Sequence, residues 1–266
     1  MSKDDAIQRV TPGSQIPDYL AKYAETETKA TQEMLKEHRV LPRLKLIQAM
    51  TDNALKDRVG EGSCILTPGE AMICDKKGNF YFVPVLFYDE WITMSDRKDK
   101  VSPMIRARSF DKTSEIAKKA ADPKKRMEEY EGGFKMRHIH CLTFPGFLYG
   151  EHQLAGQAAT LVYSKGEFGN GRTFINAVAM RRTPIWSQVW ELNPAFRDRG
   201  DKKWYGFDFQ PADEPDIKAE EVDFFLAAAK EMKELLDNRR LLVVHDEDED
   251  EDGGVPEIDP TKGAKL

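Results

Sequence analysis

The sequence predicts a mainly β fold of the α+β class, with helices at its periphery and one helix close to its C-terminus. Between residues 40 and 210, short apolar runs alternate with glycine, proline, asparagine and aspartate, which is typical of strands joined by turns. Residues 134–144 alternate between two faces with the period of two of a β-strand. Residues 217–238 instead repeat apolar side chains at helical spacing.

The first 39 residues predict an arm followed by a helix. That helix should begin after Ile16, because proline at position 17 suits a first helical turn, and should end near His38. Beyond it, the sequence predicts strands at residues 44–47, 63–73 (with a turn at 67–70), 80–88, 106–110, 134–144 and 158–164.

Several stretches carry more specific expectations. Pro84 within the apolar run 80–88 favours a sheet edge or a bulge. Residues 168–171 predict a loop, and residues 173–180 fit a helix or a strand equally well. A polar break is expected at Asn193 and Pro194. Residues 197–203 predict a charged turn, and a strand-like run begins after it at Trp204. Residues 211–215 predict a linker.

A basic helix is expected at about residues 111–131, interrupted by Pro123. It is either an exposed insertion whose lysines are solvated or a basic flap over a nucleic-acid groove. The expected organisation has four parts, namely an N-terminal arm and helix (1–39), a β core with this insertion (40–210), a C-terminal helix (211–245) and an acidic disordered tail (246–266).

Charge is distributed unevenly along the 266 residues. The formal net charge is −6, but residues 246–252 alone carry seven negative charges, which leaves −6 + 7 = +1 for the rest. Residues 97–205 contain 21 lysines and arginines against 12 aspartates and glutamates, a balance of +9. A basic middle and an acidic end indicate a polyanion-binding body with an interaction tail.

The three cysteines, Cys64, Cys74 and Cys141, are too few and too irregular for a disulfide framework. The first residues lack an apolar signal core, and no apolar run approaches the roughly 20 residues that cross a bilayer. We therefore expect a cytoplasmic protein without membrane partners.

The central block combines cations with large aromatic rings, as surfaces that hold phosphates and stack bases do. The candidate nucleic-acid contacts are Lys135, Arg137, Arg172, Arg181, Arg182, Trp186, Trp190, Arg197, Arg199, Lys202, Lys203, Trp204 and Tyr205. A half-buried sheet with a solvated cationic face is the alternative interpretation. At least one of these aromatic residues is expected in the core, and alternation places Trp204 and Tyr205 on opposite faces.

No arrangement of residues indicates catalysis or a cofactor. His138, His140 and Cys141 lie close together, but zinc usually takes four ligands in spaced pairs, and Cys141 would face away from both histidines. The glycines at 166, 169 and 171 match no phosphate-loop motif. No flanking signature supports a nucleophile triad, and no carboxylate pair fits a metal-dependent nuclease. We therefore predict a protein that is not an enzyme, with no metal and no cofactor.

Seven consecutive acidic residues cannot pack together, so the tail should stay extended. It is either a solubilising tail or a segment that competes with DNA for the basic groove and binds basic partners. The candidate partner-binding residues are Asp246, Glu247, Asp248, Glu249, Asp250, Glu251 and Asp252.

The basic and aromatic β body, the C-terminal helix and the acidic run together resemble phage single-stranded-DNA-binding proteins of the T7 type. Residues 41–47, 62–70, 82–85 and 204–205 also look like a group of phage proteins, and the likeness covers roughly residues 40–252. The resemblance implies an OB-like β-barrel and a tail that recruits replication proteins. The chain departs from that pattern because fourteen residues follow the acidic run.

We therefore expect sequence-independent binding of single-stranded DNA in phage replication or recombination, with replication or recombination proteins as possible partners of the tail. The alternatives are a non-enzymatic virion or host-interaction protein that acts through its tail, and a metal-dependent DNA-processing enzyme. The oligomeric state is left open, with a dimer as one option.

Overall fold

The computed structural model describes residues 39–51, 53–95, 104–130 and 134–243. The chain divides into two units, Met1–Arg39 and Val40–Leu266. Of the first unit only Arg39 is described, so the predicted N-terminal arm and helix lie outside the described residues. The acidic run at 246–252 lies outside them too.

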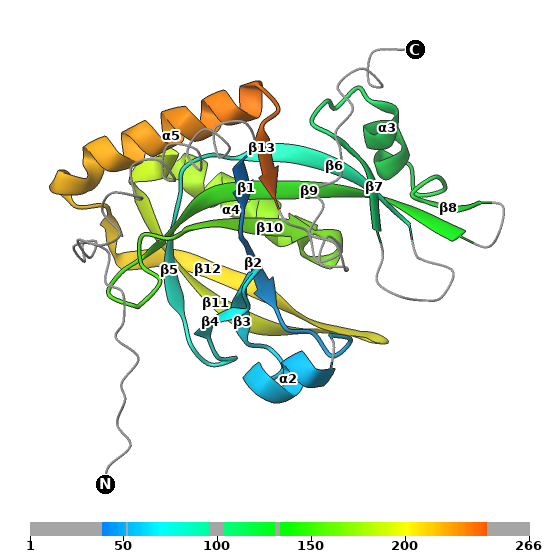
Figure 1. Ribbon diagram of the computed structural model, residues 1–266, viewed down its shortest axis with the longest axis horizontal. Coiled ribbons are helices and arrows are strands. Elements are labelled where there is room, and N and C mark those ends of the chain that lie inside the picture. The colour runs from blue at the N-terminus through cyan, green and yellow to red at the C-terminus, as the bar shows by residue number, and fades with distance from the viewer. Residues whose placement is uncertain (1–38, 52, 96–103, 131–133, 244–266) are drawn as a thin grey trace, which may run out of the picture. The chain divides into compact units, whose positions relative to one another are not determined.

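Strands dominate the described residues, which confirms the predicted mainly β, α+β fold (Figure 1). The strands are β1 (Arg39–Leu41), β2 (Arg43–Leu46), β3 (Cys64–Thr67), β4 (Ala71–Cys74), β5 (Phe80–Pro84), β6 (Tyr88–Ser95), β7 (Met104–Ser109), β8 (Met127–Tyr130), β9 (Phe134–Tyr149), β10 (Ala158–Ser164), β11 (Gln188–Arg199), β12 (Lys202–Asp216) and β13 (Leu241–Val243). The helices are α2 (Asn53–Val59), α3 (Glu115–Ala121), α4 (Phe168–Met180) and α5 (Val222–Asp237), with short 3-10 turns η1 (Lys165–Glu167), η2 (Ile185–Ser187) and η3 (Ala219–Glu221).

The long strand β9 is the centre of an 11-stranded sheet whose main path runs β12-β11-β5-β9-β10-β2-β3-β4. One edge of β9 pairs with β6 and then with β5, and the other edge pairs with β8 and then with β10. These pairings are antiparallel, whereas β10 pairs with β2 in parallel. A separate pair joins β1 to β13.

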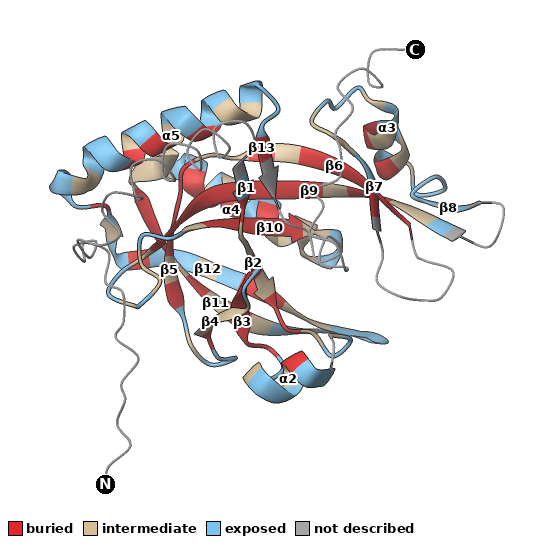
Figure 2. Ribbon diagram, viewed as in Figure 1, coloured by how far each residue is buried: buried red, intermediate tan, exposed pale blue. Residues whose placement is uncertain are grey.

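Both faces of β9 are buried between His138 and Leu148, apart from the half-buried His140, although its alternation predicts one apolar face and one face with cations (Figure 2). Ile139, Cys141 and Phe147 belong to a cluster covered by α5 through Phe225, Ala228 and Met232. On its other face, β9 contributes Leu142, Phe144 and Leu148 to a second cluster, which α4 covers through Phe174 and Val178. All the remaining strands of the main path also contribute side chains to this second cluster. A flat sheet of eight strands could not share one cluster, so the sheet is strongly curved.

The sheet does not close into a barrel within the described residues, because β12 and β4 end its main path. The OB-like β-barrel implied by the resemblance is therefore not present as a closed barrel. What the sequence predicts correctly is the class of fold and the positions of most strands.

The apolar run 80–88 is two strands instead of one. Pro84 pairs with Gly146, and Tyr88 pairs with Thr143, so three residues of the run oppose two of β9. This confirms the bulge that Pro84 predicts and excludes the edge, because β5 lies between β11 and β9.

The basic insertion is only partly helical. Helix α3 ends at Ala121, two residues before Pro123, because proline disfavours helical geometry in the residue that precedes it. The rest of the predicted helix includes β8, which pairs with the start of β9.

Three further boundaries differ from prediction. Residues 168–171 begin α4 instead of forming a loop, since Gly171 leaves the helix room against Tyr163, whose Cβ would lie 2.6 Å from an added Cβ. Strand β11 continues through Pro194, which pairs with Phe207 of β12 beyond the point, at Leu192, where the pairing of β11 with β5 ends. The predicted linker at 211–215 belongs to β12.

Candidate nucleic-acid interface

Three aromatic rings meet beside the first half of β9. Trp91 of β6 and His140 of β9 are register partners, and their rings stack with centroids 4.6 Å apart at 20°. Phe168, the first residue of α4, lies 4.6 Å from the His140 ring at 47°. The Nε2 atom of His140 is 2.6 Å from Oδ1 of Asp89, which fixes the orientation of the imidazole. Residues far apart in the sequence thus form one aromatic group.

This aromatic group borders a cavity of about 580 Å³, a size within the usual range of ligand sites. The cavity lies where β6, β9, the α3–β8 segment, η1 and the start of β12 come together. Its lining comprises Trp91, Ala120, Ala121, Arg126, Met127, Arg137, His138, Ile139, His140, Lys165, Gly166, Phe168 and Lys202.

The lining is cationic. It contains Arg126, Arg137, Lys165 and Lys202, and none of its members is a carboxylate. Lys165 and Lys202 are exposed, and neither forms an ion pair with any residue that the structure describes. Lys165 has a φ of 50°, which turns the chain sharply at the end of β10. The two exposed lysines attract anions to this side of the cavity, whereas the carboxylates of Asp89 and Glu128 contact the histidines of the lining.

His138 lines the cavity from a buried position, with 3% of its surface exposed. Its Nδ1 atom is 2.9 Å from Oγ1 of Thr93. Its Nε2 atom lies 3.5 Å from Oε2 of Glu128, near enough for an ion pair, yet it makes no hydrogen bond within the described residues. Glu128 itself accepts from Nζ of Lys119 at 2.9 Å. One ring nitrogen of His138 therefore retains unused hydrogen-bonding capacity.

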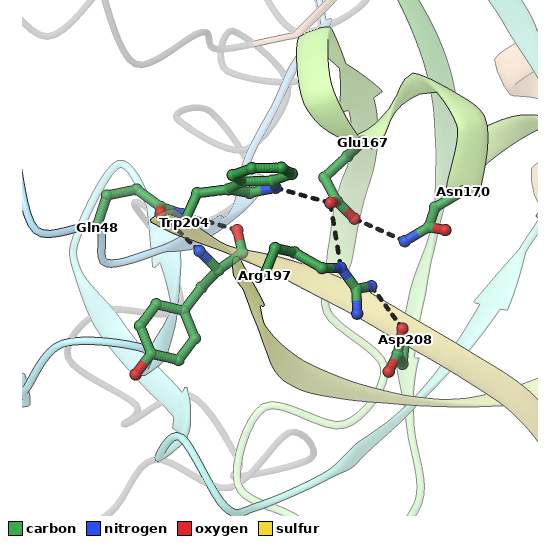
Figure 3. Close-up of polar contacts among 7 residues, drawn as sticks. Gln48, Glu167, Asn170, Arg197, Trp204 and Asp208 are labelled. Atoms are coloured by element: carbon green, nitrogen blue, oxygen red, sulfur yellow. Dashed lines mark hydrogen bonds and ion pairs between the residues drawn. The ribbon is translucent and has the colours of Figure 1, made fainter. Parts of the chain in front are cut away.

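Glu167 of η1 connects the cavity rim to the β11–β12 hairpin (Figure 3). Its Oε1 atom accepts from Nε1 of Trp204 at 2.8 Å and from Nε of Arg197 at 3.3 Å. Its Oε2 atom accepts from Nδ2 of Asn170 at 2.8 Å. Arg197 also pairs with Asp208, and these two carboxylates raise the pKa of its guanidinium, the Asp208 hydrogen bond most of all. Glu167, with its partners Asn170, Arg197 and Trp204, forms a polar cluster that we call the Glu167 hub. The hub anchors the β11–β12 hairpin next to Lys165 of the cavity.

The four predicted aromatic contacts occupy different environments. Trp190 is core, with 1% of its surface exposed and its ring against Phe174 and Phe209. Trp186 is half-buried against the cluster under α5. Trp204 is half-buried and held by Glu167, and Tyr205 is half-buried with its ring against Phe196.

The predicted cations fall into three groups: those that line the cavity, those that lie beside a carboxylate, and those that are exposed. Arg137 and Lys202 line the cavity. Arg181 pairs with Asp216, and Lys203 lies 3.7 Å from Asp198. The remaining cations outside the hub are Lys135, Arg172, Arg182 and Arg199, all exposed, with the Arg199 guanidinium 5.8 Å from the Trp204 ring centroid.

Several cavity residues were not predicted from the sequence. His140 was placed correctly on the same face as His138, but its partner Trp91 depends on a register that no local pattern reveals. Phe168 was assigned to a loop. Arg126 belongs to the basic insertion, for which a flap over a groove was one of the two interpretations, and this segment does form a wall of the cavity.

Within the described part of the chain, no group of three or more histidine, cysteine, aspartate or glutamate side chains is placed to hold a metal ion. All three cysteines are buried thiols. Cys64 and Cys74 are cross-strand partners; burial raises the pKa of the Cys64 thiol, and a hydrogen bond with Cys64 lowers that of Cys74. No described helix is both long and apolar enough to cross a membrane.

Comparison with known proteins shows a phage family. The family described as Pam3 phage gp34-like protein matches residues 10–240, which is most of the chain. No curated protein and no solved structure matches it.

Proposed function

The chain belongs to the Pam3 phage gp34-like protein family, and we propose that this phage protein binds single-stranded DNA without sequence preference during replication or recombination. One observation carries the proposal: the cavity brings three aromatic rings and four cationic side chains to one place. Phosphates need cations and unpaired bases need rings, and single-stranded DNA offers both together.

The charge of the chain supports the same proposal. The +9 balance of residues 97–205 supplies a field that attracts a polyanion along the whole central region. The acidic run at 246–252 competes with DNA for this surface and, when DNA displaces it, becomes available to basic replication or recombination proteins.

The test is fluorescence anisotropy of a labelled oligo(dT) with the full chain, across a series of salt concentrations. Binding should weaken as salt rises, because cations that neutralise phosphates release counterions. Lys202→Ala should reduce the salt slope by about one unit, because it removes one phosphate contact. Lys233→Ala is the control, since this exposed lysine of α5 lies outside both the cavity and the basic central region and pairs with Asp237.

A chain that ends at His245 tests the tail. Removing the seven acidic residues should tighten binding to oligo(dT), most strongly at low salt, where charge is least screened. If neither the full chain nor the shortened chain binds oligo(dT) at low salt, the proposed function is wrong, and an interaction protein that acts through its tail becomes the better account.

A further inference from the structure

The cavity has three chemically different walls. Its aromatic wall consists of Trp91, His140 and Phe168. The His140 ring stacks on Trp91 and is tilted against Phe168, and Trp91 also packs on Ala117 and Ala120. The α3–β8 segment adds an apolar wall through Ala120, Ala121 and Met127. Lys165 and Lys202 lie on the third side with their ammonium groups unpaired by any described carboxylate. A ligand that used all three walls would need a flat apolar ring and a separate anionic group.

The unused nitrogen of His138 adds a specific polar contact to this cavity. If the Thr93 hydroxyl donates to Nδ1, then Nε2 carries a proton and can donate; if the hydroxyl accepts, Nε2 can accept. In either tautomer Nε2 makes no hydrogen bond within the described residues, and the Glu128 carboxylate lies 3.5 Å from it. Buried polar atoms usually have partners, and a ligand group that comes nearer than Glu128 would complete the hydrogen bonding of Nε2.

We infer that the cavity is a mononucleotide subsite that takes one nucleoside monophosphate unit. The base lies against His140 and Phe168 with an edge toward His138, and the phosphate lies at Lys165 and Lys202. This inference rests on the proposed function and narrows it, because the unit is either the terminal or extruded nucleotide of a DNA strand or a free nucleotide. An inorganic anion would use only the lysines, and an acidic peptide would leave the ring wall empty.

The first experiment is isothermal titration of the full chain with dTMP, with thymidine and inorganic phosphate as separate ligands. We expect dTMP to bind more tightly than either, because it alone uses the rings and the lysines together. Lys165→Ala combined with Lys202→Ala should weaken dTMP binding by about tenfold or more, which corresponds to roughly 1.4 kcal/mol or more. Lys233→Ala should leave dTMP binding unchanged, because this lysine of α5 lies outside the cavity lining.

The aromatic wall has its own test. Phe168→Leu keeps an apolar side chain at the start of α4 but removes the ring, so dTMP binding should weaken by roughly 5- to 150-fold, the range expected for loss of one base-stacking contact. Phe196→Leu is the control, since Phe196 is an exposed ring on the β11–β12 hairpin outside the cavity lining. Phosphate binding should be the same in both variants.

Competition between bound dTMP and added oligo(dT) strands distinguishes a site for a strand end, a site for an extruded nucleotide and a site for a free nucleotide. A strand-end site should release dTMP when a 5′- or 3′-phosphorylated oligo(dT) is added, and a site for extruded nucleotides should release it to an unphosphorylated strand as well. A free-nucleotide site should retain dTMP against both strands.

If oligo(dT) binds but dTMP does not bind even at millimolar concentration, the inference fails and the proposed function stands. If phosphate binds as well as dTMP, the base contact is wrong; if nothing binds, both proposals fail.

Discussion

Tyr205 pairs with Phe196 of β11, and on the edge of β12 that no described strand pairs with, both backbone polar groups of Tyr205 are bonded by the side chain of Gln48. Its Nε2 atom donates to the carbonyl oxygen of Tyr205 at 2.9 Å, and its Oε1 atom accepts from the amide of the same residue at 2.8 Å (Figure 3). The Tyr205 ring also lies against Gly62, just before β3. The curved sheet is therefore joined across its opening by one amide side chain in place of a backbone ladder.

Replacing the side-chain amide of Gln48 should destabilise the protein where the ends of the curved sheet meet. Gln48→Ala leaves a half-buried amide and carbonyl of Tyr205 without partners, so we expect a loss of about 1–3 kcal/mol in the free energy of unfolding. Urea unfolding measures this loss, and Gln153→Ala, at an exposed loop position, is the matched control. An unchanged midpoint for Gln48→Ala would show that the bridge contributes nothing.

A contrast between two glycines tests the packing around the bulge. A Cβ added at Gly146 would lie 2.2 Å from the carbonyl oxygen of Val83, and backbone atoms cannot move aside as a flexible side chain can. Gly146→Ala should therefore destabilise the protein by about 3 kcal/mol or more. Gly169→Ala meets no atom within 4 Å and lies in α4, so it should be neutral or stabilising by up to about 1 kcal/mol. Thermal unfolding of both variants distinguishes them, and equal effects would contradict the packing described here.

The sequence predicts the local part of this structure well. The alternation of residues 134–144 places His138 and His140 on one face, because side-chain direction in a strand depends only on position along the chain. The helix near the C-terminus follows from its own periodicity, and the strands at 63–73 and 158–164 from their short apolar runs. These features need no knowledge of distant partners.

The candidate site is harder to predict because it depends on distant contacts. Trp91 and His140 meet only because β6 and β9 pair in one register. Trp190 and Trp204 look alike in the sequence, yet the first is core and the second is bonded to Glu167, which is decided by where α4 and η1 pack. Arg137 and Lys202, which line the cavity, belong to a run of cations that is visible in the sequence, whereas Phe168 stands beside glycines that resemble a loop.

The Glu167 hub should position the β11–β12 hairpin. Glu167→Gln keeps an oxygen acceptor for Trp204 but removes the charge that pairs with Arg197. Glu167→Ala removes both, so we expect a loss of about 1–3 kcal/mol in the free energy of unfolding, larger for alanine than for glutamine. Denaturant unfolding monitored by tryptophan fluorescence gives both values. Equal losses for the two variants would mean that the Trp204 hydrogen bond is unimportant.

Tyr149 provides a prediction of pH dependence. Burial, and then its hydrogen bond to Glu221, raises the pKa of this phenol from 10.0 to about 12. Since the folded pKa lies above the unfolded one, the stabilisation is fully present below about pH 10 and is lost as the pH rises toward 12. The difference in ultraviolet absorbance between the unchanged protein and Tyr149→Phe isolates this tyrosine from the others and should show a transition near pH 12. Glu221→Gln removes the carboxylate and should move that transition downward. A difference curve centred at pH 10 in the unchanged protein would show that neither burial nor the contact with Glu221 raises this pKa.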